Sequence, residues 1–118
     1  MGNLSIIKDI QQNKLEPDQL INCLDIPQNY ILSNAIKQVA KQKLDSKEVI
    51  EKLARLSALT KEENKLMGIY TVGHLAVAAL HKLGSEEALR KYEEILSSLR
   101  ECDKESVKKL IEHKALDE

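Results

Sequence analysis

The stretch that most constrains the fold is Leu66 to Leu83, which reads LMGIYTVGHLAVAALHKL. Its first fifteen residues, Leu66 to Leu80, carry no formal charge, and only Thr71 and His74 among them are clearly polar. A helix at a protein surface has one apolar stripe, whereas a helix that is apolar nearly all round is enclosed by neighbours. The run is shorter than the roughly 20 apolar residues that a membrane span needs. We therefore expect it to form the central buried helix of a small helical domain.

The composition also favours helices. The chain has 118 residues, which is the size of one domain, and it has no Trp, no Phe and only three Tyr. A core built from Leu, Ile, Val and Ala is typical of an all-helical fold. The 18 basic and 19 acidic residues nearly cancel, whereas a nucleic-acid backbone track needs Lys and Arg to dominate. We expect a single all-α domain over residues 1–118.

The apolar spacing predicts about seven helices, with no linker long enough to divide the chain. The first covers about residues 4–14, the second is short and begins at Pro17, and the third covers about residues 28–43. The fourth helix is expected to begin after a cap formed by Asp45 or Ser46.

Capping residues also delimit the last three helices. Thr60 and Glu63 have capping-box spacing, which predicts that the central helix starts there, and Gly84 is expected to end it. Ser85 then opens the sixth helix, and Asp103 is expected to cap the last one. The predicted inward positions of the sixth helix are Ala88, Leu89, Tyr92, Ile95, Leu96 and Leu99.

Three stretches of the chain align with one another without gaps. They read IKDIQQNKLEPDQLINCL from Ile7, IKQVAKQKLDSKEVIEKL from Ile36 and LAVAALHKLGSEEALRKY from Leu75. The first and second share six identities in eighteen positions, as do the second and third. Each unit is the end of one helix, a tight turn and the start of the next helix. The pattern therefore predicts a stack of helix pairs in which each pair buries its apolar face against the next.

This pattern resembles the HEAT repeat family of α-solenoids, and armadillo and other helical-hairpin repeats share its degenerate spacing. Asn29 to Leu59 and Gly68 to Ser98 look like two full repeats, Leu4 to Asp25 like a shortened first repeat, and Asp103 to Leu116 like the first helix of a final one. The resemblance implies a short α-solenoid of stacked antiparallel helical hairpins. Its units are expected at about residues 4–25, 28–59, 61–100 and 103–116.

No local motif assembles a catalytic or metal-binding site. His74 and His81 lie seven residues apart, which is too far for one helix to offer both to one metal ion. We expect His74 to be a hydrogen-bonded core or interface residue. Cys23 and Cys102 belong to no CxxC pair, which predicts two free thiols in a reducing compartment. We therefore expect no enzyme, no cofactor and a cytoplasmic location without membrane insertion.

In HEAT-like stacks the second helices of the pairs line a concave face on which partners dock, so the resemblance implies a binding surface here. We call the aligned outward positions on these helices the predicted ridge. A solvated surface without a partner is the alternative interpretation of the same charges. The predicted ridge consists of Glu48, Glu51, Lys52, Arg55, Glu87, Arg90, Lys91 and Glu94.

The sequence thus predicts a non-enzymatic protein-binding module whose partner is another protein. A bacterial immunity or antitoxin-type inhibitor is one version of this function, and the small size allows it. A nucleic-acid-binding HEAT-like protein is the second alternative, but it would need a basic ridge and an aromatic side chain in the cleft. A lyase or scaffold acting on protein-bound chromophores would need a pocket with an acidic residue. The remaining alternative is an oligomer subunit, and we expect a monomer or a weak homo-oligomer.

Overall fold

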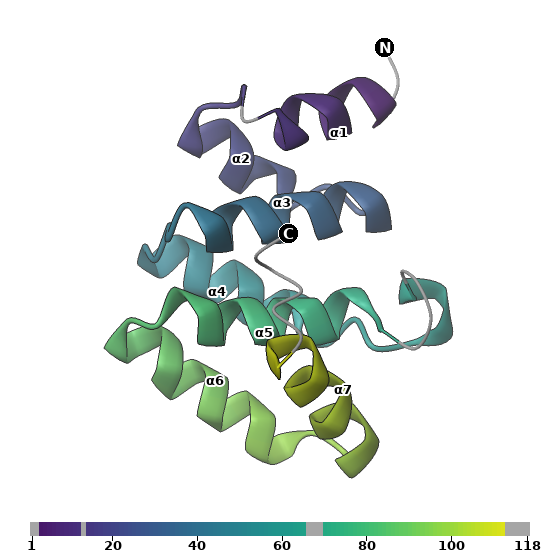
Figure 1. The fold of residues 1–118 in the computed structure, drawn as a ribbon, viewed down its shortest axis with the longest axis vertical. Coiled ribbons are helices and arrows are strands. Elements are labelled where there is room, and N and C mark those ends of the chain that lie inside the picture. Colours follow the sequence, from purple (N-terminus) through teal and green to yellow (C-terminus); the bar gives the residue numbers. More distant parts are fainter. Residues whose placement is uncertain (1–2, 13, 66–69, 113–118) are drawn as a thin grey trace.

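The computed structural model describes residues 3–12, 14–65 and 70–112. Within these ranges the chain forms seven α-helices and one 3-10 turn, and its only β-type pairing is a single bridge between Lys65 and Thr71. The all-α class predicted from the sequence is confirmed (Figure 1). The helices are α1 (Asn3–Gln11), α2 (Pro17–Cys23), α3 (Asn29–Lys41), α4 (Lys47–Leu56), α5 (Val72–Leu83), α6 (Glu86–Ser98) and α7 (Glu101–Glu112), and the 3-10 turn η1 is Glu62–Asn64.

The odd-numbered helices form one run of neighbours. In Figure 1, α1, α3 and α5 lie one below the other with similar directions, and α2, α4 and α6 descend at an angle to them. Helix α3 contacts both α1 and α5, while α5 also contacts α4, α6 and α7. The principal extents are 40 × 30 × 23 Å, so the chain is folded into a compact body.

Helix α5 is the centre of this body. All residues from Val72 to Leu80 are buried, which confirms the central buried helix predicted from the uncharged stretch, whose residues 66–69 lie outside the described ranges. Gly73 makes the closest approach, because its N–H donates to the carbonyl oxygen of Leu59 at 2.8 Å. A Cβ atom on Gly73 would lie 2.7 Å from the carbonyl oxygen of Ser57.

The start of α5 was predicted wrongly. The Thr60 and Glu63 spacing placed it near residue 60, but residues 60–65 contain the short turn η1 and no α-helix, and α5 begins at Val72 after an N-cap at Thr71. The capping box of Thr71 uses a histidine in place of the usual Glu or Gln. A search for a threonine followed three residues later by Glu or Gln therefore selects Thr60 instead of Thr71.

Several other caps are confirmed. Pro17 is the first residue of α2, where its missing N–H costs no helical hydrogen bond. Ser46 caps α4 by accepting from the N–H of Val49, and Ser85 caps α6 in the same way. Gly84 ends α5 with φ 72°, in the left-handed region that favours glycine.

Two predictions about the C-terminal helices were wrong. Helix α7 begins at Glu101, so Asp103 lies buried in its first turn rather than at its cap. Leu89 of α6 is 36% exposed, not inward, because α6 packs against α5 and α4 along one side and lies at the lower edge of the molecule in Figure 1. Ala88 is the one buried residue of α6. Four more of the predicted inward side chains pack partly buried against the core, namely Tyr92, Ile95, Leu96 and Leu99. Residues 113–116 of the last predicted unit lie outside the described ranges.

Candidate functional site

The predicted ridge occupies α4 and α6, two helices that contact each other. Lys52 and Lys91 are half-buried, so the aliphatic parts of these long side chains cover neighbouring surface. The remaining ridge residues are exposed: Glu48, Glu51, Arg55, Glu87, Arg90 and Glu94. The periodicity of the helices therefore placed the ridge correctly on the surface, although exposure alone does not make it a site.

The α4 part of the ridge is tied to the segment that follows α2. Arg55 Nη2 lies 2.6 Å from Asp25 Oδ1, and Lys52 Nζ pairs with the other oxygen of the same carboxylate. Lys52 also lies 3.8 Å from Glu48 within α4. The hydrogen bond from Lys52, together with the charges of both basic groups, holds the pKa of Asp25 below its ordinary value of 3.8.

The α6 part of the ridge forms ion pairs along its own helix. Arg90 lies 3.7 Å from Glu86, one turn earlier, and Lys91 lies 3.8 Å from Glu94. Exposed pairs of this kind contribute little to stability. The two parts of the ridge therefore differ: among the described residues, the α4 part is paired with Asp25 in a distant segment, whereas the ion pairs of the α6 part lie within α6.

A groove of about 370 Å³ borders the α4 part of the ridge. Arg55 and Asp25 contribute its charged lining, and the other described residues that line it are apolar. We call it the apolar groove. Sequence reasoning missed it because it forms where the end of α2, the following loop, α3 and the end of α4 meet. Its apolar lining consists of Leu24, Ile26, Pro27, Leu32, Leu56 and Leu59.

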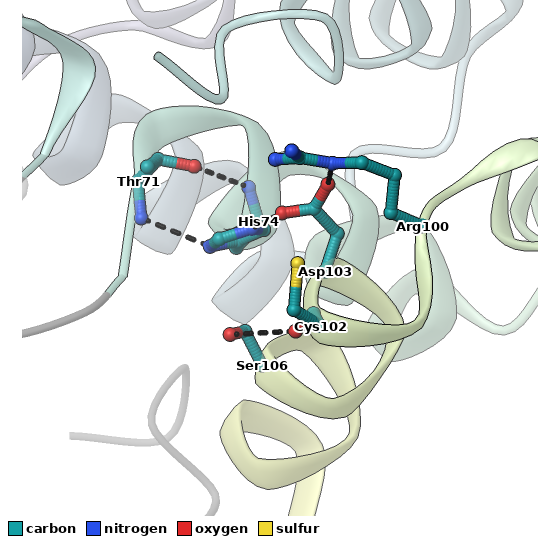
Figure 2. A network of polar contacts seen from close by, with 6 residues as sticks. All are labelled: Thr71, His74, Arg100, Cys102, Asp103 and Ser106. Atoms are coloured by element: carbon teal, nitrogen blue, oxygen red, sulfur yellow. Dashed lines mark hydrogen bonds and ion pairs between the residues drawn. The ribbon is translucent and has the colours of Figure 1, made fainter. Parts of the chain in front are cut away.

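A second candidate site is a polar network that joins α5 to α7 (Figure 2). His74 of α5 is only 4% exposed, and its Nε2 lies 2.7 Å from Oδ1 of Asp103, which is 6% exposed. The other oxygen of Asp103 accepts from Nε of Arg100 at 3.1 Å. The prediction that His74 is a hydrogen-bonded core residue is confirmed.

The partners of His74 determine its tautomer. The N–H of Thr71 donates to Nδ1 at 3.1 Å, and the hydroxyl of Thr71 in turn accepts from the backbone N–H of His74 at 3.2 Å. Because Nδ1 is an acceptor, the ring proton lies on Nε2 and is donated to Asp103. Both ring nitrogens are thus used within the protein. The hydrogen bond from His74 to Asp103 connects α5 with α7. Because Nδ1 accepts from Thr71 and Nε2 donates to Asp103, the ring is not positioned to act as a general base.

Asp103 is held in its charged form. Burial raises the pKa of this carboxyl, but the hydrogen bonds from His74 and Arg100, together with the positive charge of Arg100, outweigh burial and bring the pKa below the ordinary value of 3.8. The same contact raises the pKa of Arg100. The carboxylate therefore serves as an internal acceptor for two side chains.

The network forms one wall of an open pocket of about 640 Å³. Its basic lining residues come from the segment after α4 and from the α7 region, and we call it the basic pocket. Cys102 on its lining is exposed and Cys23 is buried, and both are free thiols, as the sequence predicted. The basic residues are Lys61, Lys65, Arg100 and Lys109, and the other lining residues are Thr60, Thr71, His74, Cys102, Asp103, Glu105 and Ser106.

Sequence reasoning missed the basic pocket. Asp103 is separated from His74 by 29 residues, and no local spacing connects either of them with Lys61. Among residues 3–12, 14–65 and 70–112, no three His, Cys, Asp or Glu side chains are grouped so as to hold a metal ion. None of the helices described is long and apolar enough to cross a membrane.

Comparison of the chain with protein-family models, with curated proteins and with solved structures finds no match in any of the three. Function is therefore inferred from the geometry of the ridge, the apolar groove and the basic pocket.

Proposed function

We propose that this protein is a non-enzymatic protein-binding module that acts through the face carrying α4 and the apolar groove. The observation that carries the proposal is the position of Arg55, which belongs to the predicted ridge and also lines the groove. Protein interfaces combine an apolar centre with a polar rim, and this surface has that arrangement. The partner would insert an apolar side chain into the groove while its polar groups meet Arg55 and Asp25.

The architecture that we propose for this function is a short HEAT-like α-solenoid of antiparallel hairpins. Two observations support it, namely the three aligned sequence units and the order of helix contacts. Helix α3 contacts α1 and α5, α5 contacts α7, and α4 contacts α6, as expected when hairpins stack in register. In such a stack the second helices, α2, α4 and α6, share one face.

The chemistry of the ridge favours a protein partner over a nucleic acid. Its eight residues are four acidic and four basic, so a phosphate backbone would meet as much repulsion as attraction. An immunity-type inhibitor is a special case of the same proposal, and the identity of the bound partner distinguishes it. The internal use of both His74 ring nitrogens supports a non-enzymatic role.

Two matched variants test the binding face. Arg55→Glu and Arg90→Glu each reverse one exposed arginine of the ridge, but only Arg55 lines the apolar groove. Proteins captured from native lysate by the wild type would be identified by mass spectrometry, purified and titrated calorimetrically. We expect Arg55→Glu to weaken binding about tenfold or more, because it changes the rim of the buried centre, and Arg90→Glu about twofold or less.

Unfolding temperatures of both variants control for damage to the fold, since Arg55 also pairs with Asp25. Hydrogen exchange on the complex should show protection at residues 24–32 and 55–59. Equal effects of the two substitutions, protection confined to another surface, or the absence of any partner would each contradict the proposal.

A further inference from the structure

Positive charge accumulates in the basic pocket. Four cationic side chains line it, against the two carboxylates of Asp103 and Glu105. Asp103 and Arg100 form an ion pair and compensate each other's charge, which leaves Lys61 and Lys109 against the single carboxylate of Glu105 even when Lys65 is not counted. The pocket consequently presents an excess of positive charge to a molecule that enters it.

The wall of the basic pocket is preorganised. The bond between His74 and Asp103 holds α7 against the beginning of α5, at the point where Thr71 and His74 close a capping box. Arg100 is oriented because its Nε donates to Asp103, and its terminal nitrogens extend beyond the carboxylate (Figure 2). A guanidinium has five N–H donors, so four remain on the terminal nitrogens. Binding would therefore cost little ordering of this wall.

The polar lining restricts the class of ligand. Among the described residues that line the pocket there is no Leu, Ile, Val, Met, Phe or Tyr, so the charged and hydroxyl groups are the features by which the pocket would recognise a ligand. Lys and Arg groups match the charge and geometry of phosphate oxygens. The volume of about 640 Å³ is sufficient for a small metabolite.

We propose that the basic pocket binds a small, polar, phosphate-bearing metabolite, with Lys61, Arg100 and Lys109 as its phosphate-binding residues. This site shares no lining residue with the apolar groove or the predicted ridge. Metabolite binding at this site would therefore be a function additional to partner binding, and a negative result for one proposal would not contradict the other.

Neighbouring lysines of α7 provide a matched test. Lys109 lines the basic pocket, whereas Lys108 is exposed and does not line it, and either substitution by Gln removes one positive charge. Inorganic pyrophosphate would be titrated into each full-length variant by calorimetry at constant ionic strength. We expect saturable binding that weakens about fivefold or more in Lys109→Gln and less than about twofold in Lys108→Gln. Lys61→Gln should behave like Lys109→Gln.

Three results would overturn the proposal. One is that pyrophosphate fails to saturate the wild type. Another is that Lys108→Gln and Lys109→Gln weaken its binding equally, which would indicate diffuse charge attraction. Citrate binding as tightly as pyrophosphate would overturn the assignment to phosphate. Because titration with pyrophosphate needs no protein partner, its failure leaves the binding experiment on Arg55 unaffected.

Discussion

The role of His74 could be predicted in part from its position. A single histidine in an uncharged helical stretch has to find hydrogen-bond partners when it is buried, and this expectation is confirmed. Its partner could not be predicted, because Asp103 lies 29 residues away and has the appearance of a helix cap. The packing of α7 on α5 selects this carboxylate, and a pattern within one helix contains no information about that packing.

Substitution of Asp103 tests the contribution of the buried pair to stability. Asp103→Ala leaves the Nε2–H of His74 buried without its acceptor, and we expect the free energy of unfolding to fall by about 3 kcal/mol. Asp103→Asn retains an acceptor oxygen but loses the charge, so its cost should be about half as large. Urea unfolding followed by circular dichroism measures both values. Equal stability of the wild type and Asp103→Ala would refute the structural role of the pair.

The stability of the wild type and of Asp103→Asn should depend on pH in different ways. The pKa of Asp103 is lowered in the folded state, so its contribution is fully present above the unfolded value of about 3.9 and is lost as the pH falls through the lower folded value. The wild type should therefore lose stability below about pH 4 more steeply than Asp103→Asn does. The variant should keep some acid sensitivity, because the pKa of Asp25 is lowered as well. Parallel curves for the two proteins would contradict this assignment.

At the scale of the helix, local chemistry predicted most boundaries. Hydroxyl caps such as Ser46 and Ser85 and the left-handed Gly84 act within one turn, so a short window of sequence contains the signal. The start of α5 was missed because Thr71 is capped reciprocally by an imidazole rather than by a carboxylate or carboxamide. The exposure of Leu89 was missed because it depends on which side of α6 packs against α4 and α5, which the spacing within α6 does not show.

Gly73 tests the close approach of α5 to the chain that follows α4. Helix propensity alone predicts that Gly73→Ala would stabilise the protein by about 1 kcal/mol. The added Cβ would, however, lie 2.7 Å from the carbonyl oxygen of Ser57 and 2.7 Å from Cγ2 of Thr60. We expect a net loss of about 1–3 kcal/mol, because backbone has to move. Thermal unfolding measures the sign, and a higher unfolding temperature would contradict the close packing.

Gly84→Ala provides the control for Gly73→Ala. The nearest atom to a Cβ on Gly84 is 3.8 Å away, so space is available, but φ is 72°. The expected cost is about 1 kcal/mol and arises from the left-handed backbone alone.

At the scale of the whole molecule, the exposed faces of helices could be predicted from the sequence and the pockets between segments could not. Helical periodicity is enough to place the charges of the predicted ridge on the surface, since each helix has an inside and an outside. The apolar groove and the basic pocket are each lined by segments distant in sequence: Leu24 and Leu59 both line the groove, and Lys61 and Lys109 both line the pocket. Their positions depend on how α2, α4, α5 and α7 pack together.

The cooperativity of the molecule should depend on α5, because this helix contacts α3, α4, α6 and α7. Ala79 lies in α5 and is 0% exposed, so Ala79→Asp would bury a carboxylate among apolar neighbours. An unpaired buried charge costs several kcal/mol, which is comparable to the whole stability of a domain of this size. We expect Ala79→Asp to lack a cooperative thermal transition by calorimetry.

Glu87→Lys is the matched control, because it reverses a charge on the exposed face of α6 and should change the free energy of unfolding by about 0.5 kcal/mol or less. A cooperative transition of Ala79→Asp close to that of the wild type would mean that α5 is not enclosed. Loss of only part of the helical signal in Ala79→Asp would mean that the hairpins on either side of α5 fold independently. We expect Ala79→Asp to lose the helical signal completely and Glu87→Lys to keep its cooperative transition. This is the result expected when one central helix joins both halves of the molecule into a single folding unit.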